Sequence, residues 1–238
     1  MNRTGRFVAQ PDDRTNDSGG ITGSVADAGE QKANRSFRQS GYAVLRGIVA
    51  GPLLSFLREY ALKSSRAGKL NAGDTFMPDT PCRDSDPFMD SLLARLISCV
   101  EITTGLKLFP TYSYFRVYKR GDILSRHTDR NACEISLSLS LGTIGAESRP
   151  IHVECAGADR SILLEPGDAL LYKGIEIPHW RQSFTGEQAA QVFLHYVNQE
   201  GPFRDLKFDE APHLNTSEAV ERIMEQFRLF LGNPATKV

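Results

Sequence analysis

Two histidines and an aspartate are the residues of this chain whose types and spacing best suit metal chemistry. His127 and Asp129 form a His-x-Asp sequence, and His179 follows further along the chain. Residues i and i+2 of an extended segment point to the same side, so His127 and Asp129 can bind one ion together while the third ligand comes from a distant element. Two imidazoles and a carboxylate suit redox-active Fe(II), because they occupy one face of an octahedron and leave positions open. Catalytic Zn(II) uses similar ligand sets, so these residues alone predict either metal.

Short segments typical of β-strands surround these residues. Segment 134–142 alternates serine or a polar residue with isoleucine and leucine, which is the period of a strand with one apolar and one polar face, and we expect its serines to face a polar cavity. Further strand-like segments are 111–118, 150–155, 160–165, 169–174 and 191–198. We expect His127 and Asp129 to open a strand of this series. The succession predicts a mainly β fold with packing helices, namely a jelly-roll or double-stranded β-helix of the cupin type.

Helical patterns flank the strands. Apolar stripes predict one helix that begins at Pro52 and another that begins at Pro87, with Asp86 as N-cap and Gly105 at its end. A third helix is predicted at 217–231. We expect all three helices to pack on the outside of the sheet.

The chain divides into a tail and one domain. Residues 1–35 are polar and glycine-rich with few large apolar side chains, so they are predicted to be disordered, because they cannot repay the entropy of ordering. Residues 36–238 are predicted to form a single domain, since a chain of 238 residues with 40% hydrophobic content can bury one core. Segment 71–86 contains proline and glycine without periodicity, and we expect it to form a loop over the pocket.

Composition limits the partners and the compartment. The formal net charge is −1 and no long basic run occurs, so no nucleic-acid partner is expected. The four cysteines show no CxxC pairing, which favours reduced thiols. The sequence has no apolar stretch near 18 residues and no export signal, so neither a membrane span nor secretion is expected. A cytoplasmic protein is the resulting expectation, and the oligomeric state stays open.

The order and spacing of these features resemble the iron(II)- and 2-oxoglutarate-dependent dioxygenases, and among them the prolyl-hydroxylase-like branch. The resemblance covers residues 36–202 and rests on Gly41-Tyr-Ala-Val-Leu-Arg-Gly47, Tyr118, His127-Thr-Asp129, Pro166-Gly-Asp168 and Pro178-His-Trp-Arg181. It implies that His127, Asp129 and His179 bind Fe(II) and form the catalytic centre. It also implies that 2-oxoglutarate and O2 are cosubstrates and that succinate and CO2 are released when a substrate C–H is hydroxylated.

The second carboxylate of 2-oxoglutarate requires a cation, which in the resembled family is an Arg or Lys about ten residues past the distal histidine. Here that position reads Gly186-Glu-Gln-Ala189 and holds no cation. Arg181 is the first candidate for this role and Arg116 is the second. The resemblance places Tyr118 at a tyrosine that contacts the cosubstrate, and Ser138 offers a further hydroxyl.

The expected activity is hydroxylation of a small polar metabolite. Two alternatives remain open: a peptide or protein hydroxylase in which segment 71–86 forms part of a groove, and a non-enzymatic metal-dependent binding protein. The presence of Asp129 disfavours a ferrous halogenase, because the resembled halogenases carry a small residue there. Two further histidines, His152 and His195, are interpreted as ordinary strand residues, and Arg126 and Arg130 as solvated surface.

Overall fold

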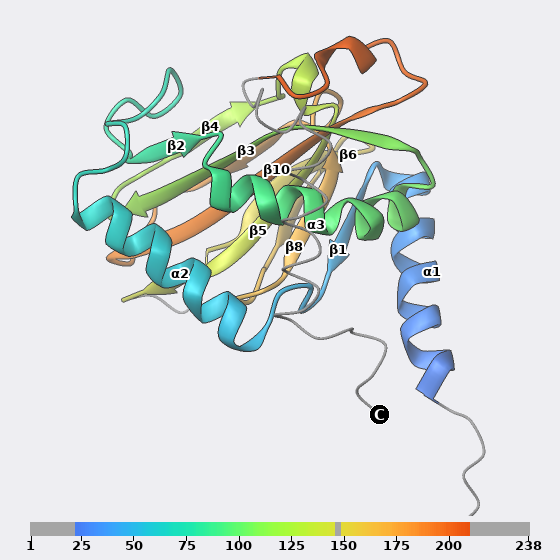
Figure 1. Cartoon of the computed structure of the whole chain (residues 1–238), viewed down its shortest axis with the longest axis horizontal. Helices are drawn as coiled ribbons and strands as arrows, with labels where there is room; N and C mark the ends of the chain where they lie inside the picture. The colour runs from blue at the N-terminus through green and yellow to red at the C-terminus, as the bar shows by residue number, and fades with distance from the viewer. Residues whose placement is uncertain (1–21, 146–148, 210–238) are drawn as a thin grey trace, which may run out of the picture.

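The computed structural model describes residues 22–145 and 149–209, with two antiparallel β-sheets at its centre (Figure 1). The larger sheet runs in the order β1 (Tyr42–Leu45), β8 (Ala169–Lys173), β5 (Ile135–Ile144), β10 (Gln188–Asn198), β3 (Leu108–Lys119) and β2 (Cys82–Asp84). The smaller sheet runs in the order β4 (Leu124–His127), β9 (His179–Arg181), β6 (Ile151–Cys155) and β7 (Ala158–Ile162). From β3 onward the chain passes back and forth between the sheets. This architecture is the double-stranded β-helix that the strand pattern predicts.

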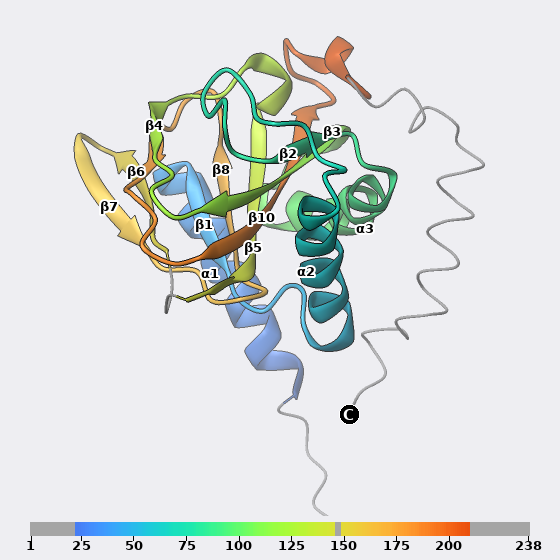
Figure 2. The same ribbon diagram turned by 90° about the vertical axis from the view of Figure 1, so that its left-hand side faces the viewer.

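Helices cover the outer face of the larger sheet. The helices are α1 (Thr22–Ser40), α2 (Gly51–Arg66) and α3 (Pro87–Thr104), and two short 3-10 helices are η1 (Asn131–Cys133) and η2 (Arg204–Leu206). Figure 2 shows α2 and α3 on the side of the larger sheet that faces away from the smaller one. The predicted ends of α3 are confirmed, because Asp86 Oδ1 accepts hydrogen bonds from the N–H groups of Phe88 and Met89, and Gly105 adopts a left-handed φ of 74°.

Strand β5 shows how alternating serine and leucine create two environments. Its leucines join the large apolar core beneath α2 and α3: Leu137, Leu139 and Leu141. Its serines point the other way, where Ser136 Oγ donates to Asp129 Oδ2 (3.0 Å) and Ser138 Oγ accepts from Gln191 Nε2 (2.9 Å). The polar space predicted from this strand therefore lies between the two sheets.

Helical structure begins earlier than the sequence predicts. Residues 22–35, which were expected to belong to a disordered tail, form most of α1. Ala33 and Phe37 pack against the main core, and Asn34 Nδ2 donates to two backbone carbonyls near the end of α3 (2.9 and 3.1 Å). These contacts attach the C-terminal half of α1 to α3 and the core, while the division of the chain into a tail and one domain stays a prediction.

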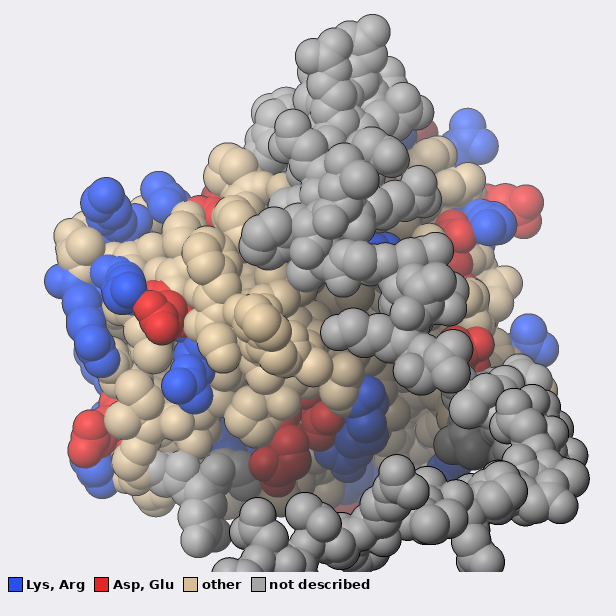
Figure 3. Space-filling model, turned by 60° about the horizontal axis from the view of Figure 1, so that its bottom comes forward, with Lys and Arg blue, Asp and Glu red and all other residues tan. Residues whose placement is uncertain are grey.

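Other expectations fall partly outside the described residues. Residues 1–21 and the helix predicted at 217–231 are not among them. Of the helices that the structure describes, none has the length and apolar content needed to cross a membrane. Figure 3 shows basic and acidic side chains mixed over one face, next to an uncharged area. The absence of a nucleic-acid partner and the cytoplasmic location stay predictions.

Candidate functional site

The structure brings His127, Asp129 and His179 together. Strand β4 pairs with β9 so that His127 lies opposite His179. Asp129 Oδ1 lies 3.7 Å from His127 Nε2 and 3.5 Å from His179 Nε2, and the possible ligand atoms of all three residues lie within 4.8 Å of one another. The Nδ1 atoms of His127 and His179 lie 2.8 and 3.0 Å from the backbone oxygens of Ser125 and Ile177. Because a carbonyl can only accept, Nδ1 carries the proton and both Nε2 lone pairs are available to a metal.

Asp129 is positioned by a tight turn beyond the end of β4, which ends at His127. The sequence predicted that His127 and Asp129 open a strand, and this prediction is wrong, because His127 is the last residue of β4. The Asp129 N–H donates to Gly174 O (2.9 Å), and its carboxylate accepts from Ser136. A Cβ atom at Gly174 would lie 2.6 Å from Asp129 Oδ2, so only glycine lets the carboxylate occupy this position.

The electrostatics of the three residues suit a cation. Burial and the neighbouring His179 imidazole lower the pKa of His127, and burial lowers the pKa of His179 to about 4. Both rings are therefore neutral near pH 7, as metal ligation requires. Burial also raises the pKa of Asp129 to about 6, so its carboxylate is still mainly ionised near pH 7, and a bound cation would lower this pKa. The donor set fits Fe(II) or another divalent metal, which would replace the long contact of 3.4 Å between the Tyr172 hydroxyl and His179 Nε2.

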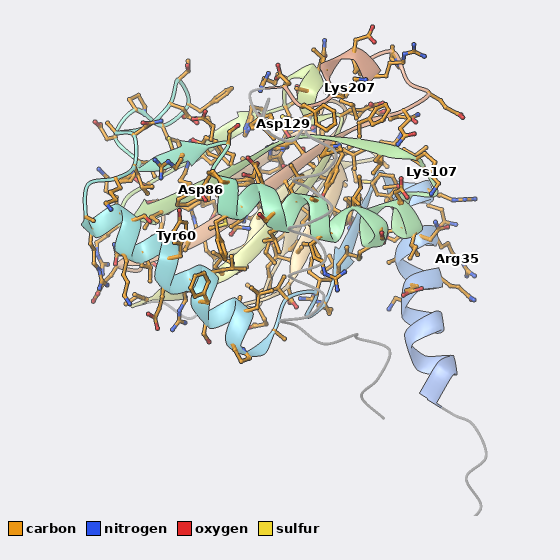
Figure 4. All side chains as sticks on the ribbon, in the orientation of Figure 1. Arg35, Tyr60, Asp86, Lys107, Asp129 and Lys207 are labelled. Carbon is orange, nitrogen blue, oxygen red and sulfur yellow. The ribbon has the colours of Figure 1, made fainter. Side chains whose placement is uncertain are left out.

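A cavity of about 590 Å³ opens beside the three residues and has aromatic walls. Its lining includes Phe76, Tyr112, Tyr114, Tyr118, Tyr172 and Phe193. The loop between α2 and β2 closes one side, and the Phe76 ring lies 4.8 Å from the His127 ring. Figure 4 places Asp129 at the same end of the molecule as this loop. The prediction that part of segment 71–86 covers the pocket is thus confirmed for residues 74–76, although residues 82–84 form β2.

A second and smaller cavity lies between the sheets and contains two buried arginines. Arg181 is 2% exposed and Arg149 is 8% exposed, and Tyr118 and Gln191 also line this cavity. Arg181 Nη1 donates to Arg149 O (2.8 Å), while Arg181 Nε and Nη2 and Arg149 Nε and Nη1 have no hydrogen-bond partner among the described residues. Burial lowers the pKa of both guanidinium groups, to about 10 for Arg149. Two buried cations with four nitrogens that lack a hydrogen-bond partner have the chemistry needed to bind an anion.

The other predicted cosubstrate residues have separate positions. Tyr118 lines both cavities, and its ring lies 4.1 Å from the Arg149 guanidinium carbon. Arg116 lies on the wall of the larger cavity, where its Nη2 is ion-paired with Asp74. Ser138 is buried between the sheets beside Gln191. Arg181 therefore has two nitrogens without a hydrogen-bond partner that could bind the cosubstrate carboxylate, whereas Arg116 already binds the Asp74 carboxylate.

Two residues at the site were not identified from the sequence. Arg149 lies in a connection before β6 and belongs to no motif, so only the pairing of β6 with β9 brings it to Arg181. His195 was interpreted as an ordinary strand residue, yet it lines the larger cavity, with its Nδ1 3.0 Å from Ser136 Oγ. His195 is paired with Ser136 of β5 and lies two residues after Phe193, so the alternation of β10 places both side chains on the cavity face. A lone histidine within an apolar strand was the only available signal.

The remaining candidates differ in exposure. Arg126 lies on the outer face of the smaller sheet, where it ion-pairs with Glu154 and stacks on Trp180 (4.4 Å), as expected for surface. Arg130, also expected at the surface, lines the larger cavity and pairs with Asp209 (2.6 Å). The proximity of Arg130 to the cavity follows from the turn that carries Asp129.

Solved structures share this fold, although comparisons of the sequence find no match. No protein-family model and no curated protein matches the chain. The alpha-ketoglutarate-dependent epimerase SnoN from nogalamycin biosynthesis is 12% identical with a TM-score of 0.62, covering 72% of this chain and 84% of that one. A prolyl-4-hydroxylase from Pseudomonas putida is 17% identical (TM-score 0.58; 71% and 98% covered). HygX from Streptomyces hygroscopicus, solved with nickel, 2-oxoglutarate and hygromycin B, is 13% identical (TM-score 0.58; 71% and 88% covered).

The fold is therefore the double-stranded β-helix of the 2-oxoglutarate-Fe(II) oxygenases, as the sequence resemblance predicts. At these identities the likeness shows the fold alone. The chemistry depends on the side chains that line the two cavities.

Proposed function

We propose that this protein is an Fe(II)- and 2-oxoglutarate-dependent oxygenase that hydroxylates a small polar molecule. The observation that carries the proposal is the joint presence of a metal-ligand triad and an unpaired arginine pair. His179 and Arg181 are two residues apart on β9, so both side chains point between the sheets, where both are buried. A cosubstrate with a second carboxylate accounts for a buried arginine pair beside the metal ligands, which a structural metal site does not require.

Each side chain has a defined task in this proposal. His127, Asp129 and His179 would hold Fe(II), which with 2-oxoglutarate and O2 supplies the oxidant for a substrate C–H and yields succinate and CO2. Arg181 and Arg149 would hold the distal carboxylate, since a guanidinium binds a carboxylate through two parallel hydrogen bonds. The burial of both arginines keeps water away from this ion pair and strengthens it.

The larger cavity supports a small-molecule substrate. Its volume of about 590 Å³ lies within the range of small-ligand sites, which is roughly 300–1,000 Å³. Aromatic rings form its walls, while the Tyr112 and Tyr114 hydroxyls provide polar groups that can orient a ligand. The loop that carries Phe76 closes one side of the cavity, which suits an enclosed ligand better than an extended peptide.

The proposal is tested by adding Fe(II) and 2-oxoglutarate anaerobically to the full chain. We expect a weak visible charge-transfer band, because a three-residue ligand set leaves adjacent positions open for a bidentate ligand. The band should vanish in His179→Ala and persist in the matched control His152→Ala, whose ring stacks on Trp180 away from the cavities. Admission of O2 should then produce succinate slowly, and a metabolite screen should identify the compound that accelerates it.

The same experiment distinguishes the enzyme from a binding protein. If the folded, iron-loaded chain gives neither the band nor oxygen-dependent succinate, the oxygenase proposal fails. A metal-dependent binding protein on the same fold is then the better interpretation.

A further inference from the structure

A second group of metal-ligating side chains lies on the other side of Asp129. Cys133 from η1 and His195 from β10 line the same cavity as Asp129. One ligand atom from each of the three residues lies within 4.8 Å of the other two. Cys133 is 3% exposed and His195 is 5% exposed, so both side chains are held by surrounding structure. We propose that Asp129, Cys133 and His195 form a second divalent-metal site, which is selective for soft ions such as Zn(II), Cd(II) or Co(II).

The geometry of Asp129 allows it to serve this second site. Its Oδ1 atom lies between His127 and His179, whereas its Oδ2 atom accepts from Ser136 Oγ. The two oxygens of this carboxylate therefore face different neighbours. A carboxylate can bridge two metal ions, and paired sites of this kind hold ions roughly 3.5–4 Å apart. The second site therefore borders the triad and shares one residue with it.

His195 is directed toward this position by the fold. Along β10, Phe193 and His195 line the cavity and alternate with the core residues Val192, Leu194 and Tyr196, so the alternation of the strand directs His195 toward the cavity. Ser136 Oγ lies between Asp129 Oδ2 and His195 Nδ1, at 3.0 Å from each. Ser136 has one proton, and an ionised Asp129 can only accept it, so His195 Nδ1 is the donor to Ser136. The proton of His195 therefore lies on Nδ1, which leaves Nε2 as the nitrogen that can bind a metal.

The donor atoms determine which ions this site prefers. A nitrogen, a sulfur and an oxygen ligand form a typical set for Zn(II), whereas the triad without sulfur suits Fe(II). In a tetrahedral zinc site, ligand atoms lie about 3.4–3.6 Å apart, so the three side chains need shifts of about 1 Å from their present spacing. Binding releases the Cys133 thiol proton to solvent and leaves the thiolate on the ion. The fourth position remains open to water.

The site is tested by titrating Co(II) into the metal-free full chain without oxygen. Thiolate ligation gives a near-ultraviolet sulfur-to-cobalt charge-transfer band that oxygen and nitrogen ligands do not give. We expect two equivalents to bind in the wild type, with the band assigned to one of them. Cys133→Ser should lose the band. His195→Gln should lower the affinity for the Co(II) ion that produces the band by about 10-fold or more. Cys155→Ser is the matched control and should keep the band, because Cys155 Sγ donates to Ser40 O outside the cavity.

A second variant separates this proposal from the proposed function. The double substitution His127→Ala and His179→Ala should remove the Co(II) equivalent that the triad binds and should retain the thiolate band. Circular dichroism verifies that each variant is folded. If Cys133→Ser does not fold, His195→Gln still tests the second site. A folded wild type that shows no thiolate band, or a band that survives Cys133→Ser, would overturn the proposal while leaving the oxygenase proposal untouched.

Discussion

Replacement of Gly174 by alanine is expected to damage the metal site although no metal ligand is substituted. An added Cβ would lie 2.2 Å from Cys133 O, 2.6 Å from Asp129 Oδ2 and 2.7 Å from Ser136 Oγ. The backbone cannot simply retreat, because Gly174 O accepts from the Asp129 N–H (2.9 Å) and Gly174 N donates to Glu134 O (3.0 Å). The new methyl group therefore displaces the Asp129 carboxylate or breaks the turn that holds it.

The expected magnitude follows from these contacts. Overpacking of this kind costs about 1–3 kcal/mol of folding stability. Displacement of Asp129 also breaks its hydrogen bond from Ser136, and loss of such a supporting contact lowers metal affinity by about 10- to 100-fold. We therefore expect Gly174→Ala to lower both the Tm and the affinity for Fe(II) or Co(II).

Anaerobic calorimetry with Co(II), together with thermal unfolding of the metal-free protein, measures both effects. Gly29→Ala is the matched control, because Gly29 lies in α1 and an added Cβ there meets nothing within 4 Å. Its metal affinity should be unchanged, and its helix should gain up to about 1 kcal/mol from the propensity of alanine. An unchanged affinity and Tm in Gly174→Ala would refute the reasoning.

Three further predictions concern the neighbouring groups. Arg181→Lys and Arg149→Lys should each weaken 2-oxoglutarate binding to the anaerobic iron complex by about 10-fold or more, because an ammonium cannot make the planar bidentate contact. Arg116→Lys should have a smaller effect in the same titration, and the opposite order would place the anchor in the larger cavity. Asp74→Asn should lower the free energy of unfolding by about 1–3 kcal/mol, because it leaves Arg116 buried without its anion, although Asp74 itself is partly exposed. Hydrogen exchange in the loop between α2 and β2 should then become faster. Unchanged protection of this loop would contradict the prediction. Removal of Fe(II) by a chelator should lower the Tm by about 5–10 °C if Fe(II) was present at 100 times its Kd, and a similar shift in His179→Ala would show that Fe(II) binds elsewhere.

The sequence determined the local features of this protein. Alternation of serine and leucine in residues 134–142 predicted a strand with one polar face, because side chains on successive residues of a strand point to opposite sides. Asp86 and Gly105 predicted both ends of α3, since capping depends on neighbouring residues along the chain. The same local spacing made His127 and Asp129 a plausible ligand pair, and the order of these features predicted the double-stranded β-helix.

Only the tertiary structure decided which distant residues share the site. Arg149 lies beside Arg181, and His195 beside Ser136, because strand pairing places them there, and no periodicity in the sequence specifies such a pairing. Composition also gave no sign of the helix at residues 22–35, where Asn34 donates to carbonyl groups at the end of α3 that are remote in sequence. Local patterns depend on nearby residues. The smaller cavity with Arg149 and Arg181, and the surroundings of Asp129, depend instead on the register between strands that are far apart in the chain.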